Sequence, residues 1–96
     1  MLILKDKDLE KVRDIIDLIS SVEIKSSINL MIDEYIDGFR NGKYKDKNKT
    51  YWRMDCVELL GALKLLRKLG YFRDDDYKFI TNYLCRYGER KRFIFF

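Results

Sequence analysis

The chain has 96 residues, a length typical of a single domain. Apolar residues make up 47% of the chain and charged residues 38%, which is enough apolar material for one core and too much for a disordered chain. The formal net charge of +4 is unevenly distributed, because residues 1–42 carry a net charge of −3 and residues 43–96 a net charge of +7. This asymmetry bears on binding partners and not on the fold.

Histidine and proline are absent, and Cys56 and Cys85 lie far apart in the sequence. The chain therefore lacks the commonest general base and the commonest zinc ligand, and it contains no phosphate-binding glycine loop and no nucleophile motif. We expect no enzymatic activity, no metal and no cofactor. We expect two buried free thiols in a reducing compartment, and a cytoplasmic protein without a signal peptide, a membrane span or a membrane partner.

Two helices are predicted in the acidic half. The first runs from Leu9 to about Ser20, is capped by Asp8, and has its apolar residues on one helical face. The second runs from about Ser26 to Asn41, where Gly42 is placed for a left-handed stop. The connection at residues 22–25 alternates apolar and charged residues, which fits either a short strand or the first turn of the second helix.

Two more helices are predicted in the basic half. The third runs from about Met54 to Leu69 and has so wide an apolar face that we expect it to be the central helix. Gly61 inside it costs about 1 kcal/mol relative to alanine, either because another helix approaches closely there or by chance. The fourth begins at Asp74 and runs to about Tyr87, with Gly88 as its stop.

The two ends of the chain are apolar. Residues 93–96 and residues 1–4 either dock separately on the helices or pair with each other as a two-stranded ribbon. The C-terminal residues also fit a peptide that docks on a partner, although a place in the core is favoured. The predicted fold is mainly α, a single compact bundle of about four helices, with this small β pair as a further feature.

A basic loop at residues 42–53 is the strongest candidate binding segment. Its lysines alternate, aromatic residues are interleaved with them, and an arginine closes it: Lys43, Tyr44, Lys45, Lys47, Lys49, Tyr51, Trp52 and Arg53. A second basic cluster follows the fourth helix and consists of Arg90, Lys91 and Arg92, with Arg86 one turn earlier. The alternative for the loop is a solvated segment in which Tyr51 and Trp52 cap the core at the start of the third helix.

These segments predict a binding protein that docks on an acidic protein surface as an adaptor, regulator or inhibitor, with charge steering the encounter and Tyr44, Tyr51 or Trp52 anchoring it. The alternative is a nucleic-acid-binding protein whose lysines contact phosphates, against which the three carboxylates at residues 74–76 argue. A second copy of the chain is another candidate partner. Size and an AT-rich type of composition suit a phage or mobile-element protein that acts on a host complex handling nucleic acid.

Overall fold

The computed structural model describes residues 6–44 and 50–95, and for Thr50, Tyr51 and residues 91–95 it describes the backbone alone. Within these ranges the chain forms four helices and no strand: α1 (Lys7–Asp17), α2 (Val22–Arg40), α3 (Thr50–Lys68) and α4 (Asp74–Phe95). The predicted helical bundle is therefore confirmed.

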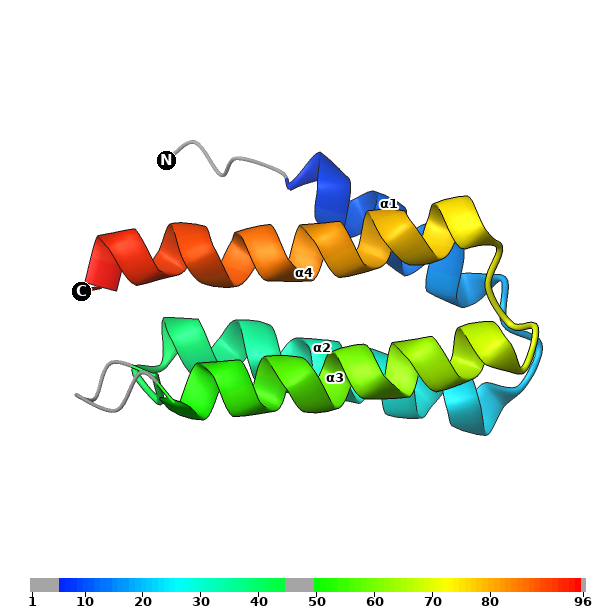
Figure 1. Cartoon of the computed structure of the whole chain (residues 1–96), viewed down its shortest axis with the longest axis horizontal. Coiled ribbons are helices and arrows are strands. Elements are labelled where there is room, and N and C mark those ends of the chain that lie inside the picture. The colour runs from blue at the N-terminus through cyan, green and yellow to red at the C-terminus, as the bar shows by residue number, and fades with distance from the viewer. Residues whose placement is uncertain (1–5, 45–49, 96) are drawn as a thin grey trace.

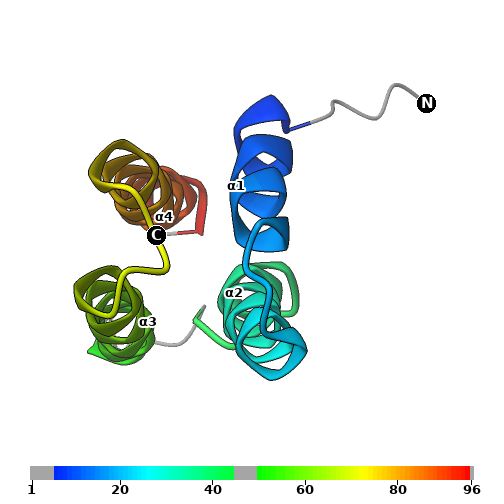
Figure 2. The same cartoon turned by 90° about the vertical axis from the view of Figure 1, so that its right-hand side faces the viewer.

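The four helices pack around one core (Figure 1). α2, α3 and α4 run roughly along the long axis, while the shorter α1 is seen from its side in Figure 2 and crosses them. α1 packs on α2 and α4, and α3 packs on the same two helices. The α1–α2 and α3–α4 turns lie at one end of the molecule, and the end of α2, the start of α3 and the end of α4 lie at the other.

Local capping decides where the first two helices begin. The carboxylate of Asp6 accepts hydrogen bonds from the backbone N–H groups of Asp8 and Leu9, so the prediction that Asp8 caps the helix is wrong by two residues. The hydroxyl of Ser21 accepts from the N–H of Ile24 at 3.3 Å. α2 therefore begins at Val22, which makes residues 22–25 its first turn and not a strand.

Gly42 ends α2 as predicted and Gly70 ends α3, but Gly88 does not end α4. Gly42 and Gly70 adopt left-handed φ angles of 84° and 88°, which a residue without a Cβ adopts at little cost. Gly88, by contrast, lies inside α4, which continues to Phe95. Residues 93–95 are consequently helical, and the predicted β pair is wrong for this segment. Its other expected strand, Met1–Leu4, lies outside the described residues.

The core is built from apolar side chains of all four helices. Tyr35 of α2 is buried in this core, and the Tyr35 hydroxyl donates a 3.2 Å hydrogen bond to the carbonyl of Leu84 in α4. Cys56 is buried as expected, but Cys85 is exposed, so the prediction of two buried thiols is wrong for Cys85. None of the described helices is long and apolar enough to cross a membrane.

Candidate binding surface

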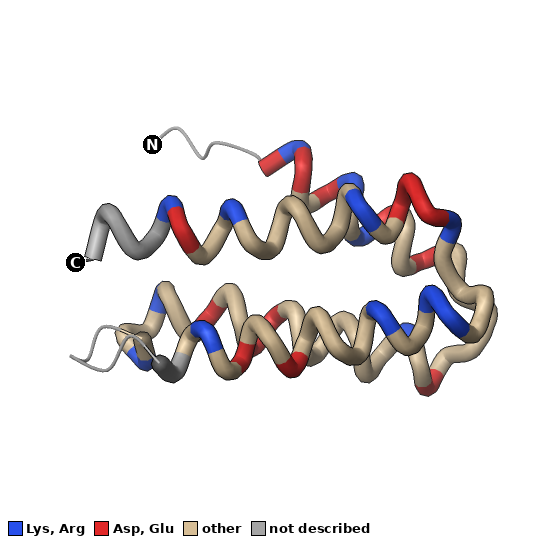
Figure 3. The backbone as a smooth tube through the Cα atoms, viewed as in Figure 1, with Lys and Arg blue, Asp and Glu red and all other residues tan. Residues whose placement is uncertain are grey.

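The described parts of both predicted basic segments lie at the same end of the bundle, where α2 ends, α3 begins and α4 completes its last turns (Figure 3). We call the described cations of this region the basic end; they are Arg40, Lys43, Arg53, Arg86 and Arg90. Arg53 and Arg90 lie almost forty positions apart in the sequence, and the fold brings their helices together.

A glycine contact holds α4 against the other helices at this end. A methyl group at Gly88 would lie 2.3 Å from the Tyr35 Oη and 2.8 Å from Cζ3 of Trp52. These distances leave no room for a Cβ, so α4 approaches Tyr35 of α2 and Trp52 of α3 closely at Gly88. This contact sets the position of Arg90, which follows two residues later, relative to the start of α3.

The loop that follows α2 is tied to α3 through Asp55. Tyr44 is buried, and its hydroxyl donates a 2.5 Å hydrogen bond to Oδ2 of Asp55. The ammonium of Lys43 lies 3.0 Å from the same oxygen. Burial works against ionisation of Asp55, but the hydrogen bonds from Tyr44 and Lys43 outweigh it and hold the pKa of this carboxyl below its usual value. Part of the Lys43 charge is therefore compensated within the chain.

Trp52 belongs to the core. It packs beside Phe39 and Gly88, and its indole Nε1 is buried with no hydrogen-bond partner among the described residues. The exposed guanidinium of Arg53 lies 5.7 Å from the Trp52 ring centre, within cation–π range. The prediction that Tyr44 and Trp52 anchor a partner is corrected here, since large rings are needed to fill this end of the bundle. For Trp52 the alternative, a cap on the core, agrees with its burial.

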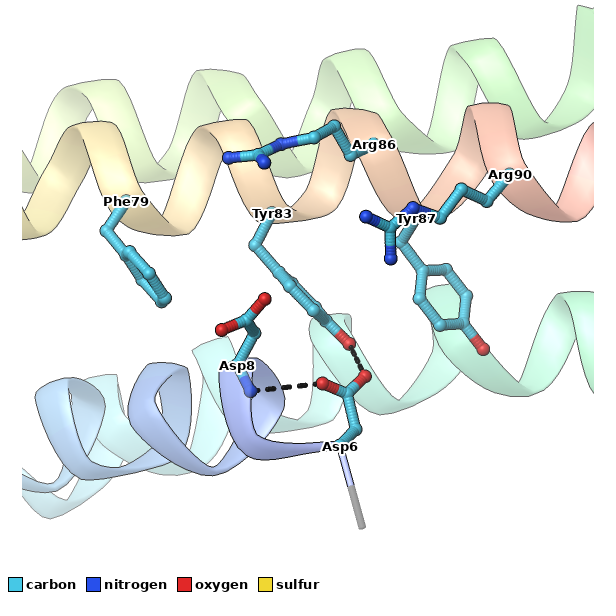
Figure 4. Close-up of a pocket in the computed structure, with 7 residues that line it drawn as sticks. All are labelled: Asp6, Asp8, Phe79, Tyr83, Arg86, Tyr87 and Arg90. Atoms are coloured by element: carbon cyan, nitrogen blue, oxygen red, sulfur yellow. Dashed lines mark hydrogen bonds between the residues drawn. The ribbon is translucent and has the colours of Figure 1, made fainter. Parts of the chain in front are cut away.

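A small crevice separates the start of α1 from the second half of α4 (Figure 4). It is lined by Asp6, Asp8, Phe79, Tyr83, Arg86, Tyr87 and Arg90 and has a volume of about 40 Å³, room for a few water molecules and too little for an organic ligand. The Tyr83 hydroxyl donates a 2.6 Å hydrogen bond to the carboxylate of Asp6. Burial and this bond raise the pKa of Tyr83. The Tyr83–Asp6 hydrogen bond therefore links α4 to the start of α1, and the crevice beside it is too small to be a ligand pocket.

Carboxylates are interspersed with the cations throughout the basic end. Besides the Lys43–Asp55 pair, Arg40 lies 3.9 Å from Asp37. Burial works against ionisation of Asp6, but the hydrogen bonds from Tyr83, Leu9 and Asp8, with a smaller contribution from the charge of Arg90, hold the pKa of Asp6 below its usual value. The described surface is thus a mosaic of both charges and not a continuous field of one sign.

The other predicted site residues are placed only in part. Lys45, Lys47 and Lys49 lie outside the described residues, whereas Tyr51 is a helical position of α3 and Lys91 and Arg92 are helical positions of α4 whose side chains are not described. The part of the chain that is described holds no cluster of potential metal ligands. Sequence reasoning missed the Asp6–Tyr83 and Tyr44–Asp55 bonds. No local pattern signals the first, since its partners are 77 positions apart.

Searches against family models, curated proteins and solved structures found no match to this chain.

Proposed function

We propose that the chain is a small non-enzymatic binding protein, an adaptor, regulator or inhibitor, that docks through the basic end on an acidic surface of a partner protein. The observation that carries this proposal is the meeting of two separate basic segments at one end of the bundle. Cations from two segments gathered at one end can steer an acidic partner and raise its association rate, and the effect weakens as salt increases.

The mosaic of charges favours a protein over a nucleic acid. A phosphate backbone laid across the basic end would meet Asp6, Asp37 and Asp55 as well as the cations, and these carboxylates repel phosphate. A protein surface offers both signs and can match such a pattern. In addition, Tyr44 and Trp52 are buried, so they are not available to stack on unpaired bases.

Nucleic-acid binding is the second candidate, and one observation favours it. Five further cations belong to the same two segments: Lys45, Lys47, Lys49, Lys91 and Arg92. They increase the positive charge that these two segments carry in the sequence. In that case each phosphate contact adds about 0.9 to the slope of log K against log salt on duplex DNA.

An affinity capture separates the two candidates. The tagged chain is incubated with lysate of its native host, and one half of the sample is treated with nuclease. We expect a protein to be retained in a fixed ratio to the bait in both halves. Nucleic acid in the untreated half, with no protein left after digestion, would overturn the protein-partner proposal and favour the phosphate-binding one.

A further inference from the structure

An apolar stripe runs along the outer face of α3. Met54, Val57 and Leu65 are 55%, 67% and 57% exposed, although all three are apolar. Their spacing, with Gly61 between them, is three, four and four residues, which places them on one face of a helix. This face points away from the buried side of α3, which carries Trp52 and the core leucines. The stripe consequently contributes nothing to the core of a single chain.

Gly61 lies at the centre of the stripe, and no contact within the chain explains why this position is a glycine. A glycine within a helix costs about 1 kcal/mol relative to alanine. At Gly88 this cost is explained by the contact with Tyr35 and Trp52, but no described atom lies within 4 Å of where a Cβ on Gly61 would be. A small residue at the middle of an exposed apolar helix face is what allows the backbone of a second helix to come close.

The two flanks of the stripe carry opposite charges. At about 100° per residue, Arg53 and Lys64 lie on the flank towards α4, and Lys68 ends the stripe on the side of that flank. On the flank towards α2, Glu58 lines a small pocket at the interface between α2 and α3 together with Glu34. Further along the same interface, Glu23 lines an apolar groove with Leu65.

We propose that this face pairs with the same face of a second copy, with the two α3 helices parallel about a two-fold axis between them. In that arrangement the acidic flank of each copy faces the basic flank of the other. Glu58 comes within reach of Arg53 of the second copy, and Glu23 lies at the level of Lys64 and Lys68. An antiparallel arrangement would instead set each flank against its own kind, which is repulsive.

This dimer is weak and leaves the basic end accessible. One helix–helix contact buries an area at the low end of specific interfaces, so we expect a dissociation constant of about 10–100 µM. Because the helices are parallel, the two basic ends come to lie side by side and can engage one partner together. The pairing itself does not depend on the proposed function, and its test uses the chain alone.

Sedimentation equilibrium between 5 µM and 1 mM tests the pairing. The two-fold axis places residue 61 against its own copy, so Gly61→Glu opposes two carboxylates at the centre of the contact, and we expect association to weaken at least tenfold. Leu30→Glu is the matched control, since Leu30 is 58% exposed on α2, away from the stripe, and the charge change is the same. A wild-type monomer at 1 mM overturns the proposal, as does a dimer that Gly61→Glu leaves intact. If the wild type is a monomer and Gly61→Glu no longer captures the host protein that the wild type captures, the face binds that protein instead.

A charge exchange tests the orientation. Arg53→Glu sets like charges against Glu58 of the second copy and should weaken the dimer. Adding Glu58→Arg to the same chain restores opposite charges across the parallel interface and should recover most of the loss. If the double variant is no better than Arg53→Glu alone, the parallel arrangement is wrong.

Discussion

Substitution by alanine should change the free energy of unfolding in opposite directions at two glycines that lie in helix interiors. Gly61 and Gly88 both lie within long helices, α3 and α4, so a scale of helix propensity predicts that alanine stabilises each by about 1 kcal/mol. The surroundings differ, however. A Cβ at Gly61 meets open space, whereas a Cβ at Gly88 overlaps the Tyr35 hydroxyl and the Trp52 ring.

The expected magnitudes follow from these distances. Gly61→Ala should raise the free energy of unfolding by about 1 kcal/mol, since nothing opposes the gain in propensity. Gly88→Ala gains the same amount but forces the Trp52 ring to move, and overpacking of this kind costs about 1–3 kcal/mol. It also displaces the Tyr35 hydroxyl from Leu84, which costs about 1 kcal/mol more. We expect a net loss of about 1–3 kcal/mol.

Urea unfolding followed by circular dichroism at about 0.5 µM measures both values at a concentration where most of the proposed dimer is dissociated. A difference of about 2–4 kcal/mol between the two variants corresponds to at least 8 °C in Tm for a domain of this size. If Gly88→Ala were as stable as Gly61→Ala, the close packing of α4 on Tyr35 and Trp52 would be refuted.

Three further predictions concern the titratable and reactive groups. Tyr44→Phe removes the hydrogen bond to Asp55 and should lower the free energy of unfolding by about 1 kcal/mol in urea denaturation. It should also raise the pKa of Asp55, which is visible by NMR titration. Because the folded-state pKa values of Asp6 and Asp55 are lowered, the contribution of these carboxylates to stability is complete above about pH 4 and is lost as the pH falls through the folded-state values. The variant Asp6→Asn should therefore show a smaller loss of stability in acid than the wild type, because the part due to Asp6 is removed. A thiol reagent at pH 8 should label the exposed Cys85 rapidly, while burial, which raises the pKa of Cys56, delays that thiol until the chain is unfolded. Equal labelling rates would contradict the burial of Cys56.

Sequence patterns predicted the helices well because apolar periodicity reflects the face that each helix buries. Helix boundaries were less predictable. Asp6 and Asp8 are the same residue type two positions apart, and only the extended backbone of Asp6 lets its carboxylate reach the next N–H groups. Gly88 resembles a helix stop in sequence, but a glycine also permits close packing. Which role applies depends on Tyr35 and Trp52, residues far away in the chain.

The binding surface was predictable in its charge and not in its aromatic residues. Long charged side chains stay at the surface in almost any fold, so Arg53 and Arg90 lie where their charge suggests. Tyr44 lies in the first half of the segment, which has no apolar periodicity and therefore favoured an exposed loop, whereas for Trp52 a cap on the core was left open as the alternative. Their burial results from packing against Phe39 and α4, and that packing exists only once the bundle is assembled.

The central claim is that the basic end, and not net charge alone, binds a protein partner. The most direct test compares two double variants of equal net charge for capture of that partner at 100 mM salt. Arg86→Glu with Arg90→Glu changes the basic end, and Arg73→Glu with Lys78→Glu changes the opposite end of α4. We predict that the first variant loses at least tenfold in affinity while the second binds like the wild type, with both folded by circular dichroism. Equal losses in the two variants would contradict the claim, because they would mean that the location of the positive charge does not matter.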